Sequence, residues 1–423
     1  MHSGKKIVWM TSFSHFITHG YMTLLPAVLI AIAGEHSMSF TDIGIIANIG
    51  YFLYGLGSFP AGYFADRIGS KRVLSLGILG MAISSLLVGV SRGTFGFAAA
   101  YAALGIFASI HHPAGLSLIA RRIDSGKGRA LGFHGVFGNL GLFFSPLVAG
   151  LAVIFFGSWR AAYILYGIIG LFFFLIIYYA RVEDEKDFSF KDILRWIKGE
   201  NHESIRESSS AKSKIGAGIV IPAALLLLYL GSILSGFIFR GSLTFFPTLF
   251  QQDVSFASHH DEPMVIAGYI TTGVLSFGLI GAWFGGYVTD KIKHPELIPA
   301  VIFLVVTPCL YLISRFTEYR LILISGLFSL IYYAWQPTQN YLIAKYTKKS
   351  SHGMGFGFNF FLIFGMGSLA TSTGGYVTDQ FSVDQFYLIM AMVAATALFA
   401  ALSVFLFRNT LLRSSSQTAV KVD

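Results

Sequence analysis

Twelve apolar runs divide this sequence of 423 residues almost from end to end. A membrane helix needs about 20 mostly apolar residues to cross about 30 Å of hydrocarbon, and each run is close to that length or longer. We expect membrane-spanning helices at residues 7–33, 40–65, 71–91, 95–119, 129–156, 159–181, 217–250, 264–289, 296–314, 321–344, 353–377 and 384–407.

The composition supports a membrane protein. Hydrophobic residues make up 54% of the chain and charged residues 12%, whereas a soluble protein carries about 25% charge. An ordinary soluble enzyme, a disordered chain and a disulfide scaffold are therefore excluded, and the single cysteine cannot form an internal disulfide. The net charge of +9 reflects where the loops lie, so we expect the lipid bilayer and no nucleic acid as a partner.

Basic residues are distributed unevenly over the loops. With both termini placed in the cytoplasm, 25 of the 30 Lys and Arg residues fall in cytoplasmic segments, four fall outside and Arg240 lies within a span. Cytoplasmic loops of membrane proteins carry such an excess. We therefore expect a multi-pass protein of the inner (cytoplasmic) membrane with both termini in the cytoplasm.

One long polar segment, residues 182–216, interrupts the series after six spans. It predicts an N-terminal six-helix half at 1–181, a cytoplasmic linker, and a C-terminal six-helix half with a short cytoplasmic tail at 217–423. Apolar residues recur at helical spacing within the linker, which fits an amphipathic helix on the inner membrane face and a partly ordered tether equally well.

The two halves repeat one sequence pattern. GYFADRI at 62–68 resembles GYVTDKI at 286–292, and HGYMTLLP at 19–26 aligns with RGSLTFFP at 240–247. A longer loop after the seventh span reconciles the two offsets. The repeat predicts an all-α integral membrane protein with twelve transmembrane helices in two pseudo-symmetric six-helix halves.

This organisation resembles the major facilitator superfamily of secondary transporters. The resemblance is most specific at GYFADRIGSKR, residues 62–72, which is similar to the loop signature between spans 2 and 3 of that family, although Ser70 replaces a basic residue. In the family this loop holds the two halves in one conformation. The resemblance implies a conformational latch formed by Gly62, Asp66, Arg67, Gly69, Lys71 and Arg72, with Asp290 and Lys291 in the second copy.

Three short stretches are similar to the fosmidomycin-resistance branch of the superfamily: SHF at 14–16, HHPAG at 111–115 and FRGSLTFFP at 239–247. That branch tends to carry Asn-Asp at the positions of Thr18 and His19, and an acidic residue at the position of Ala114. This chain therefore lacks carboxylates that could carry protons there.

Ionisable residues at bilayer depth are expensive and are functional candidates by default. Arg240 stays charged at physiological pH, and no carboxylate within the spans is an obvious partner. We expect Arg240 to bind an anionic substrate in a water-filled cavity. The alternative is an arginine capped by backbone carbonyls beside the kink at Pro247.

Histidines gather in the N-terminal half. His15 and His19 share one face of the first span because they are four residues apart, and the fourth span brings His111 and His112 to a similar depth. We expect His15, His19 and His111 to contact the substrate, with His19 facing its repeat equivalent Arg240. We expect His134 to hydrogen-bond between helices.

The tenth span offers aromatic and amide side chains, which suit an organic molecule better than a bare ion. Trp335 and Gln336 occupy the repeat positions of His111 and His112. We assign Tyr333, Trp335, Gln336 and Gln339 to the substrate site.

These features predict a transporter and not an enzyme. No glycine run is followed by the Lys-Ser/Thr pair of a nucleotide-binding loop, so we expect no cofactor and no use of ATP. We expect a monomeric secondary active transporter that moves a small organic anion by alternating access. Coupling to protons would use histidine; exchange against a counter-ion, and uptake or efflux, stay open.

Two other functions use the histidines differently. A transition-metal or metal-chelate exporter would bind its ion at His15, His19, His111 and His112, although Arg240 would repel cations. A di-iron membrane enzyme would need more histidines on the cytoplasmic side, whereas the remaining seven of the 12 are scattered.

Overall fold

The computed structural model describes residues 3–38, 40–180, 182, 223–261 and 263–420. The linker predicted at 182–216 therefore lies outside the described residues, apart from Val182. In the N-terminal part of the chain the helices are α1 (Ser3–Glu35), α2 (Phe40–Leu56), α3 (Ser58–Ile68), α4 (Ser70–Val90), α5 (Gly93–Ala108), α6 (His111–Arg122), α7 (Lys127–Phe156) and α8 (Arg160–Tyr179).

The C-terminal part is helical as well. Its elements are α11 (Ala223–Asp253), α12 (Ser255–Ser258), α13 (Pro263–Lys291), α14 (Leu297–Ile313), α15 (Glu318–Tyr332), α16 (Trp335–Tyr346), the 3₁₀ helix η1 (Lys349–Ser351), α17 (His352–Phe360), the π-helix η2 (Phe361–Met366), α18 (Leu369–Gln380) and α19 (Val383–Val420).

Twelve membrane crossings account for these helices. Ten helical segments of the described chain are long and apolar enough to span a membrane, and α14 is a shorter apolar helix. The twelfth crossing is α1, which has 33 residues and carries hydroxyl and histidine side chains that lower its hydropathy. Three crossings consist of two consecutive helices each: α2 with α3, α5 with α6, and α15 with α16.

Prolines explain these three interruptions. Pro60, Pro113 and Pro337 each follow a break within one helical turn, and a proline ring clashes with the carbonyl about one turn earlier. As a result, His111 and Trp335 become the first residues of α6 and α16. The two breaks therefore place candidate site residues at helix starts within the membrane.

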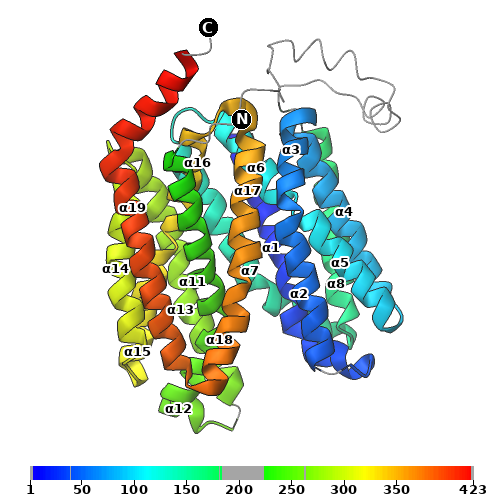
Figure 1. Ribbon diagram of the computed structural model, residues 1–423. Coiled ribbons are helices and arrows are strands. Elements are labelled where there is room, and N and C mark those ends of the chain that lie inside the picture. Colours follow the sequence, from blue (N-terminus) through cyan, green and yellow to red (C-terminus); the bar gives the residue numbers. More distant parts are fainter. Residues whose placement is uncertain (1–2, 39, 181, 183–222, 262, 421–423) are drawn as a thin grey trace.

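The helices form two groups that lie side by side (Figure 1). In the first group α1 packs on α7, and α4 packs on α5 and α8; in the second, α19 packs on α11 and α14. The groups meet where α3 packs on α17 and where α7 packs on α13. The site must therefore be sought between these two contacts.

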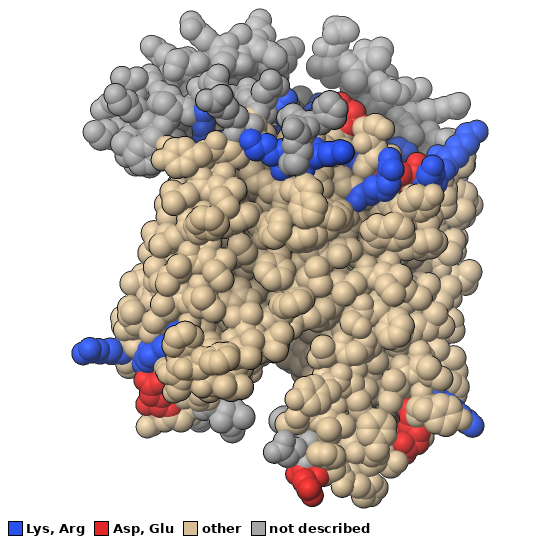
Figure 2. Space-filling model, turned by 180° about the vertical axis from the view of Figure 1, so that it is seen from behind, with Lys and Arg blue, Asp and Glu red and all other residues tan. Residues whose placement is uncertain are grey.

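The two ends of the molecule differ in shape and charge. We call the end that holds the N-terminus, the α3–α4 turn and the C-terminal part of α19 the linker side, because α8 also ends there. Figure 2 shows most of the visible Lys and Arg at the linker side and a hollow between the two groups at the opposite side. The structure is therefore closed at the linker side and open at the other.

Candidate functional site

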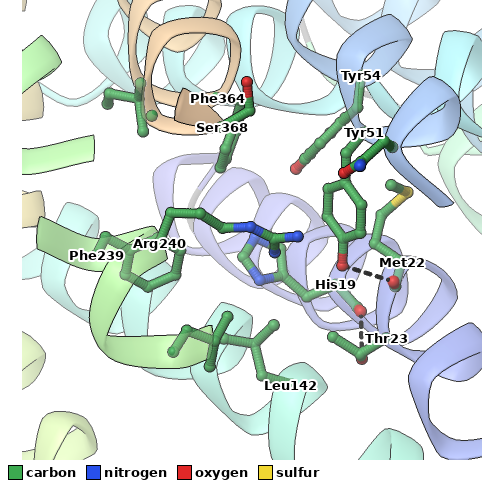
Figure 3. Close-up of a pocket in the computed structure, with 14 residues that line it drawn as sticks. His19, Met22, Thr23, Tyr51, Tyr54, Leu142, Phe239, Arg240, Phe364 and Ser368 are labelled. Atoms are coloured by element: carbon green, nitrogen blue, oxygen red, sulfur yellow. Dashed lines mark hydrogen bonds between the residues drawn. The ribbon is translucent and has the colours of Figure 1, made fainter. Parts of the chain in front are cut away.

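A first cavity lies between the two halves. Together with the open solvent at its mouth it amounts to about 630 Å³, and α1, α2 and α7 face α11 and η2 across it (Figure 3). Its lining consists of His19, Met22, Thr23, Asn48, Tyr51, Tyr54, Leu142, Phe239, Arg240, Leu243, Ile363, Phe364, Gly367 and Ser368. We call it the arginine cavity.

Arg240 is the only Lys or Arg in this lining. Its guanidinium carbon lies 4.5 Å from the centroid of the Tyr51 ring, and Figure 3 shows the side chain reaching from α11 toward that ring. The Tyr51 hydroxyl donates to the carbonyl oxygen of Met22 at 2.9 Å, which holds the ring in place. Because the described lining contains no Asp or Glu, the cavity presents a fixed cation without a protein counter-charge.

A second cavity adjoins the first, since His19, Phe239, Ile363 and Phe364 line both. Together with the open solvent at its mouth it amounts to about 530 Å³. Its other lining residues are aromatic, amide or hydroxyl side chains: Asn139, Ser235, Tyr332, Tyr333, Trp335, Gln336, Gln339 and Phe360. We call it the amide cavity. Its described lining carries polar side chains among apolar ones but no Lys, Arg, Asp or Glu, in contrast to the arginine cavity.

Five buried histidines lie beside these cavities: His15 and His19 of α1, His111 and His112 of α6, and His134 of α7. The Nε2 atoms of His15 and His19 are 3.0 Å apart, and those of His19 and His112 are 3.4 Å apart. His15 Nδ1 lies 2.8 Å from the main-chain oxygen of His134. The structure therefore brings together the five histidines expected to form one group in this half, and the hydrogen bond between helices expected of His134 is made by its main-chain oxygen.

The rings of this histidine cluster stack on one another. His15 and His134 are 4.2 Å apart between centroids with planes inclined by 14°, and the His111 plane is inclined to these two by 17° and 11°. His112 stacks on Phe360 of the other half at 4.0 Å and 7°. The cluster is therefore continuous with the contact between the halves.

The linker side is closed by two similar contacts between the halves. In the first, which we call the Asp66 contact, the carboxylate accepts hydrogen bonds from the backbone nitrogens of Gly353 and Met354, both at 2.8 Å. Arg121 pairs with the same carboxylate, and both side chains are almost fully buried. A carboxylate at the start of α17 is favourable, because helix N-termini present unpaired N–H groups and a positive dipole end.

The second contact, the Asp290 contact, joins α13 to the start of α7. The Asp290 carboxylate accepts from the backbone nitrogens of Gly128 at 2.7 Å and Arg129 at 2.8 Å. The side chain of Arg129 also reaches this carboxylate at 3.3 Å but is 61% exposed. The two contacts share their backbone geometry and differ in their ion pairs.

The family model of the Major Facilitator Superfamily matches residues 11–371. The chain belongs to the Major Facilitator Superfamily. It is therefore a multi-pass membrane transporter and not an enzyme, and the predicted all-α fold in two six-helix halves is confirmed.

Curated relatives within the superfamily have low identity. The Fosmidomycin resistance protein of Escherichia coli (strain K12) is 23% identical over 95% of this chain and 93% of its own length, which confirms the resemblance read from three short stretches. The Probable L-galactonate transporter of the same strain is 25% identical, over 38% of this chain and 35% of its own length. This chain thus matches only about a third of that protein.

Solved superfamily structures show the same fold. The proton:xylose symporter XylE superposes with a TM-score of 0.75 at 14% identity, over 96% of this chain and 95% of that one. The human organic anion transporter MFSD10 gives 0.74 at 17% identity, over 94% and 99%.

The structure distributes the predicted substrate residues over three places. Arg240 and His19 both line the arginine cavity, on opposite halves, and His19 also lines the amide cavity with Tyr333, Trp335, Gln336 and Gln339. His15 and His111 line neither cavity. His111 lies behind them, where its Nδ1 is 2.8 Å from Ser14 Oγ.

The predicted latch residues also separate. Gly62 and Asp66 lie at the Asp66 contact, and Asp290 forms its counterpart. Gly69 has a φ of 99° and makes the α3–α4 turn possible. The remaining predicted residues make contacts within their own half. Arg67 lies over the Tyr63 ring and Lys291 over the Tyr287 ring. Lys71 donates to the carbonyl oxygens of Tyr178 and Ala180, and Arg72 donates to the carbonyl oxygen of Ile68.

Ser70, which stands where the family signature has a basic residue, makes hydrogen-bonding contacts of its own. It is fully buried, lies 2.7 Å from Ser117 Oγ, and accepts a hydrogen bond from Arg121 at 3.1 Å. It therefore helps to hold Arg121 against Asp66.

Sequence reasoning missed several residues of the site. Sequence reasoning does not single out Tyr51 and Asn48, which line the arginine cavity, Asn139, which lines the amide cavity, or Arg121, which pairs with Asp66. An amide inside an apolar span is a usable signal for Asn48 and Asn139, because polar groups at that depth need partners. The sequence offers no comparable signal for Tyr51.

Proposed function

We propose that this protein is a monomeric secondary transporter that carries a small organic anion across the inner membrane, with Arg240 in the arginine cavity as the anion-binding residue. The observation that carries the proposal is a permanent cation in a cavity between the halves whose described lining contains no carboxylate. A bidentate guanidinium suits a carboxylate or phosphonate. The names of relatives, among them a D-galactonate transporter and a Fosmidomycin resistance protein, are compatible with such a substrate.

Alternating access is part of this proposal. The described conformation is closed by the Asp66 and Asp290 contacts and hollow at the opposite side. The excess of basic residues assigns the linker side to the cytoplasm, so this conformation would be the outward-open one. Breaking both contacts while the outer side closes would expose the same cavity to the cytoplasm.

Proton coupling would use His19. Because His15 Nδ1 faces the carbonyl oxygen of His134, that nitrogen carries the proton in a neutral ring, and His15 Nε2 is an acceptor. His19 Nε2–H then donates to His15 Nε2, which leaves His19 Nδ1 as the basic atom. A proton taken up there would add a second positive charge to the cavity that holds Arg240, and would favour anion binding.

The test is substitution of Arg240→Lys, which keeps the charge and removes the bidentate geometry. Loss of a charge-assisted hydrogen bond costs about 1.5–3 kcal/mol, or about ten- to a hundredfold in affinity. We expect that loss in calorimetric binding of the purified protein to a panel of carboxylates and phosphonates. Arg320→Lys is the matched control, since Arg320 is exposed. If Arg240→Lys binds as tightly as the parent, Arg240 is structural and the proposal fails.

Transport of a transition metal or its chelate is the second candidate. One nitrogen from each of His15, His111, His112 and His134 lies within 4.8 Å of the others, so the set includes His134 where we expected His19. Lone pairs lie in the ring planes, and the near-parallel planes of His15, His111 and His134 do not direct them to one point. Stoichiometric metal in purified protein would revive this candidate.

A further inference from the structure

One buried histidine lies apart from the histidine cluster, at the linker side. His352 is the first residue of α17 and is only 2% exposed. Its Nε2 lies 3.1 Å from the main-chain oxygen of Ala344 and therefore carries a proton, and its Nδ1 makes no hydrogen bond within the described chain. A second proton on the ring would place a charge and an N–H group where no acceptor is available.

The other half of the molecule covers this histidine. α17 packs on α3 and α6 (Figure 1), and a Cβ added at Gly353, the next residue, would overlap the main-chain oxygen of Gly62. Because Gly353 and Met354 donate to Asp66, His352 lies directly at the Asp66 contact. Separation of the halves at this contact would therefore expose its ring to solvent.

The surroundings of His352 oppose a positive charge on its ring. Arg121 and Lys127 of the other half repel such a charge, and so does the positive dipole end of α17. The main-chain groups of Ala344 and Thr347 favour a charged ring, but the effect of burial is larger.

The nearby acidic groups cannot offset this opposition, because they already have partners: Asp66 with Arg121, Asp124 with Lys349 at 3.4 Å, and Glu296 with Lys345 and Tyr346. Tyr229 of α11 also reaches the first turn of α17, where it donates to the main-chain oxygen of Gly355. A protonated His352 finds no free counter-charge among these groups, so the closed conformation keeps its ring neutral.

The internal repeat shows how the two contacts differ at this position. KGR at 127–129 aligns with HGM at 352–354, and the second and third residues of each triplet supply the backbone donors to Asp290 or Asp66. Lys127 is partly exposed, and a lysine keeps its charge over the pH range in which histidine titrates. Of the two contacts, the Asp66 contact is therefore the one with a histidine at the start of its donor helix.

We infer that His352 is a pH sensor for closure of the linker side: its ring is neutral while the Asp66 contact is closed and binds a proton when the halves separate there. This inference rests on the proposed alternating access and adds regulation to it. A step that takes up a proton becomes more favourable as the pH falls. Acidification at the linker side therefore shifts the equilibrium toward the conformation that is open at that side.

The test measures the open population against pH in the purified full chain. Spin labels at the exposed positions Ser125 and Lys293 lie on opposite halves and outside α17. Because an exposed histidine is half protonated near pH 6.5, the ratio of open to closed molecules should rise about tenfold from pH 7.5 to pH 5.5. His352→Gln keeps a donor for Ala344 and cannot titrate. We expect it to match the parent at pH 7.5 and to lose this rise.

Two controls separate the ring of His352 from other causes. His294→Gln, at a partly exposed histidine of the α13–α14 loop, should keep the full rise, because its ring is accessible in the closed conformation. Asp66→Asn leaves Arg121 buried without a counter-charge and should lengthen the distance at both pH values. Titration of Asp66 or of the histidine cluster would persist in His352→Gln, so the comparison with the parent isolates His352.

Each failure has a distinct meaning. A parent whose distances do not change with pH overturns the sensor, and so does a rise that survives in His352→Gln. In both cases the proposed alternating access stands if Asp66→Asn lengthens the distance. If neither pH nor Asp66→Asn lengthens it, the linker side does not open, and alternating access fails together with the sensor. Anion binding at Arg240 is measured separately by calorimetry and is unaffected by these outcomes.

Discussion

The Asp66 and Asp290 contacts occupy repeat-related places and are built alike in their backbone. Each aspartate accepts two backbone N–H groups at the start of a helix in the other half. They differ in their cations, because Asp66 has the buried Arg121 whereas Asp290 has the exposed Arg129. Lys345 follows Arg121 by the same 224 residues that separate Asp290 from Asp66 and is therefore its repeat equivalent. It pairs instead with Glu296. The comparison teaches that backbone geometry follows the internal symmetry while side-chain electrostatics has diverged.

The largest effect on closure of the linker side should come from the glycines that each contact contains. A Cβ added at Gly62 would overlap the carbonyl oxygen of Gly353, and one added at Gly286 would overlap that of Gly128. We expect Gly62→Ala and Gly286→Ala each to prevent closure of the linker side. Electron–electron distance measurements between spin labels at the exposed positions Ser125 and Ser350 should show longer distances.

Gly375→Ala is the control for these variants, since no atom lies within 4 Å of its added Cβ. Unchanged distances in Gly62→Ala and Gly286→Ala would show that the backbones can separate slightly without opening. The close glycine packing that the two contacts have in common would then not be needed for closure.

The next largest effect should separate the two aspartates. Asp66→Asn leaves Arg121 buried without a counter-charge, and breaking a buried pair in this way costs about 3–5 kcal/mol. Asp290→Asn removes an exposed pair worth about 0–1 kcal/mol and weakens a helix cap worth about 1 kcal/mol. The same spin labels should report a much larger open population at the linker side for Asp66→Asn. Equal populations would mean that burial of Arg121 contributes nothing.

A smaller effect is expected when the cations are removed. Arg121→Gln should open part of the population, because the Asp66 carboxylate keeps both backbone donors. Arg129→Gln should change it by less than about 1 kcal/mol. Added salt should weaken the Asp290 contact more than the Asp66 contact, because exposed pairs are screened. The reverse order of salt sensitivity would contradict the assigned difference.

The smallest effect on this equilibrium is expected from Glu296→Gln. Glu296 accepts from Lys345 and Tyr346 within the C-terminal half, so its loss should lower the unfolding temperature of the protein without changing the distances between labels. A shift in those distances would mean that Lys345, once released, reaches the Asp290 contact.

The sequence predicts most of the fold because two local properties determine it: the length of each apolar run must match the bilayer thickness, and the charge of each loop determines its side of the membrane. The repeat adds the equivalence of Asp66 with Asp290, and of His19 with Arg240. The sequence does not predict which side chains pair with one another. Arg121 and Lys345 stand at equivalent positions, yet one reaches Asp66 and the other Glu296, and that choice depends on which acidic groups the packed helices bring near.

The candidate site shows the same limit. Helical spacing places His15 and His19 on one face, and both belong to the cluster. It cannot show that His15 lies behind the cavity wall while His19 forms it, because that depends on how α1 packs against α7. Periodicity defines a face, whereas tertiary packing decides which part of that face borders open space.

The use of backbone donors by both aspartates has a consequence for how such a chain can change over generations. Met354 supplies only its amide N–H to the Asp66 contact, and every residue except proline carries that group. Arg129 supplies its amide N–H to the Asp290 contact and adds its exposed side chain. The side chains at these two positions can therefore be replaced while the backbone hydrogen bonds persist, and only the exposed Arg129 ion pair is lost. Inheritance of each contact then depends on one acidic residue and a pair of glycines, whereas side chains in the first turn of the donor helix are free to vary.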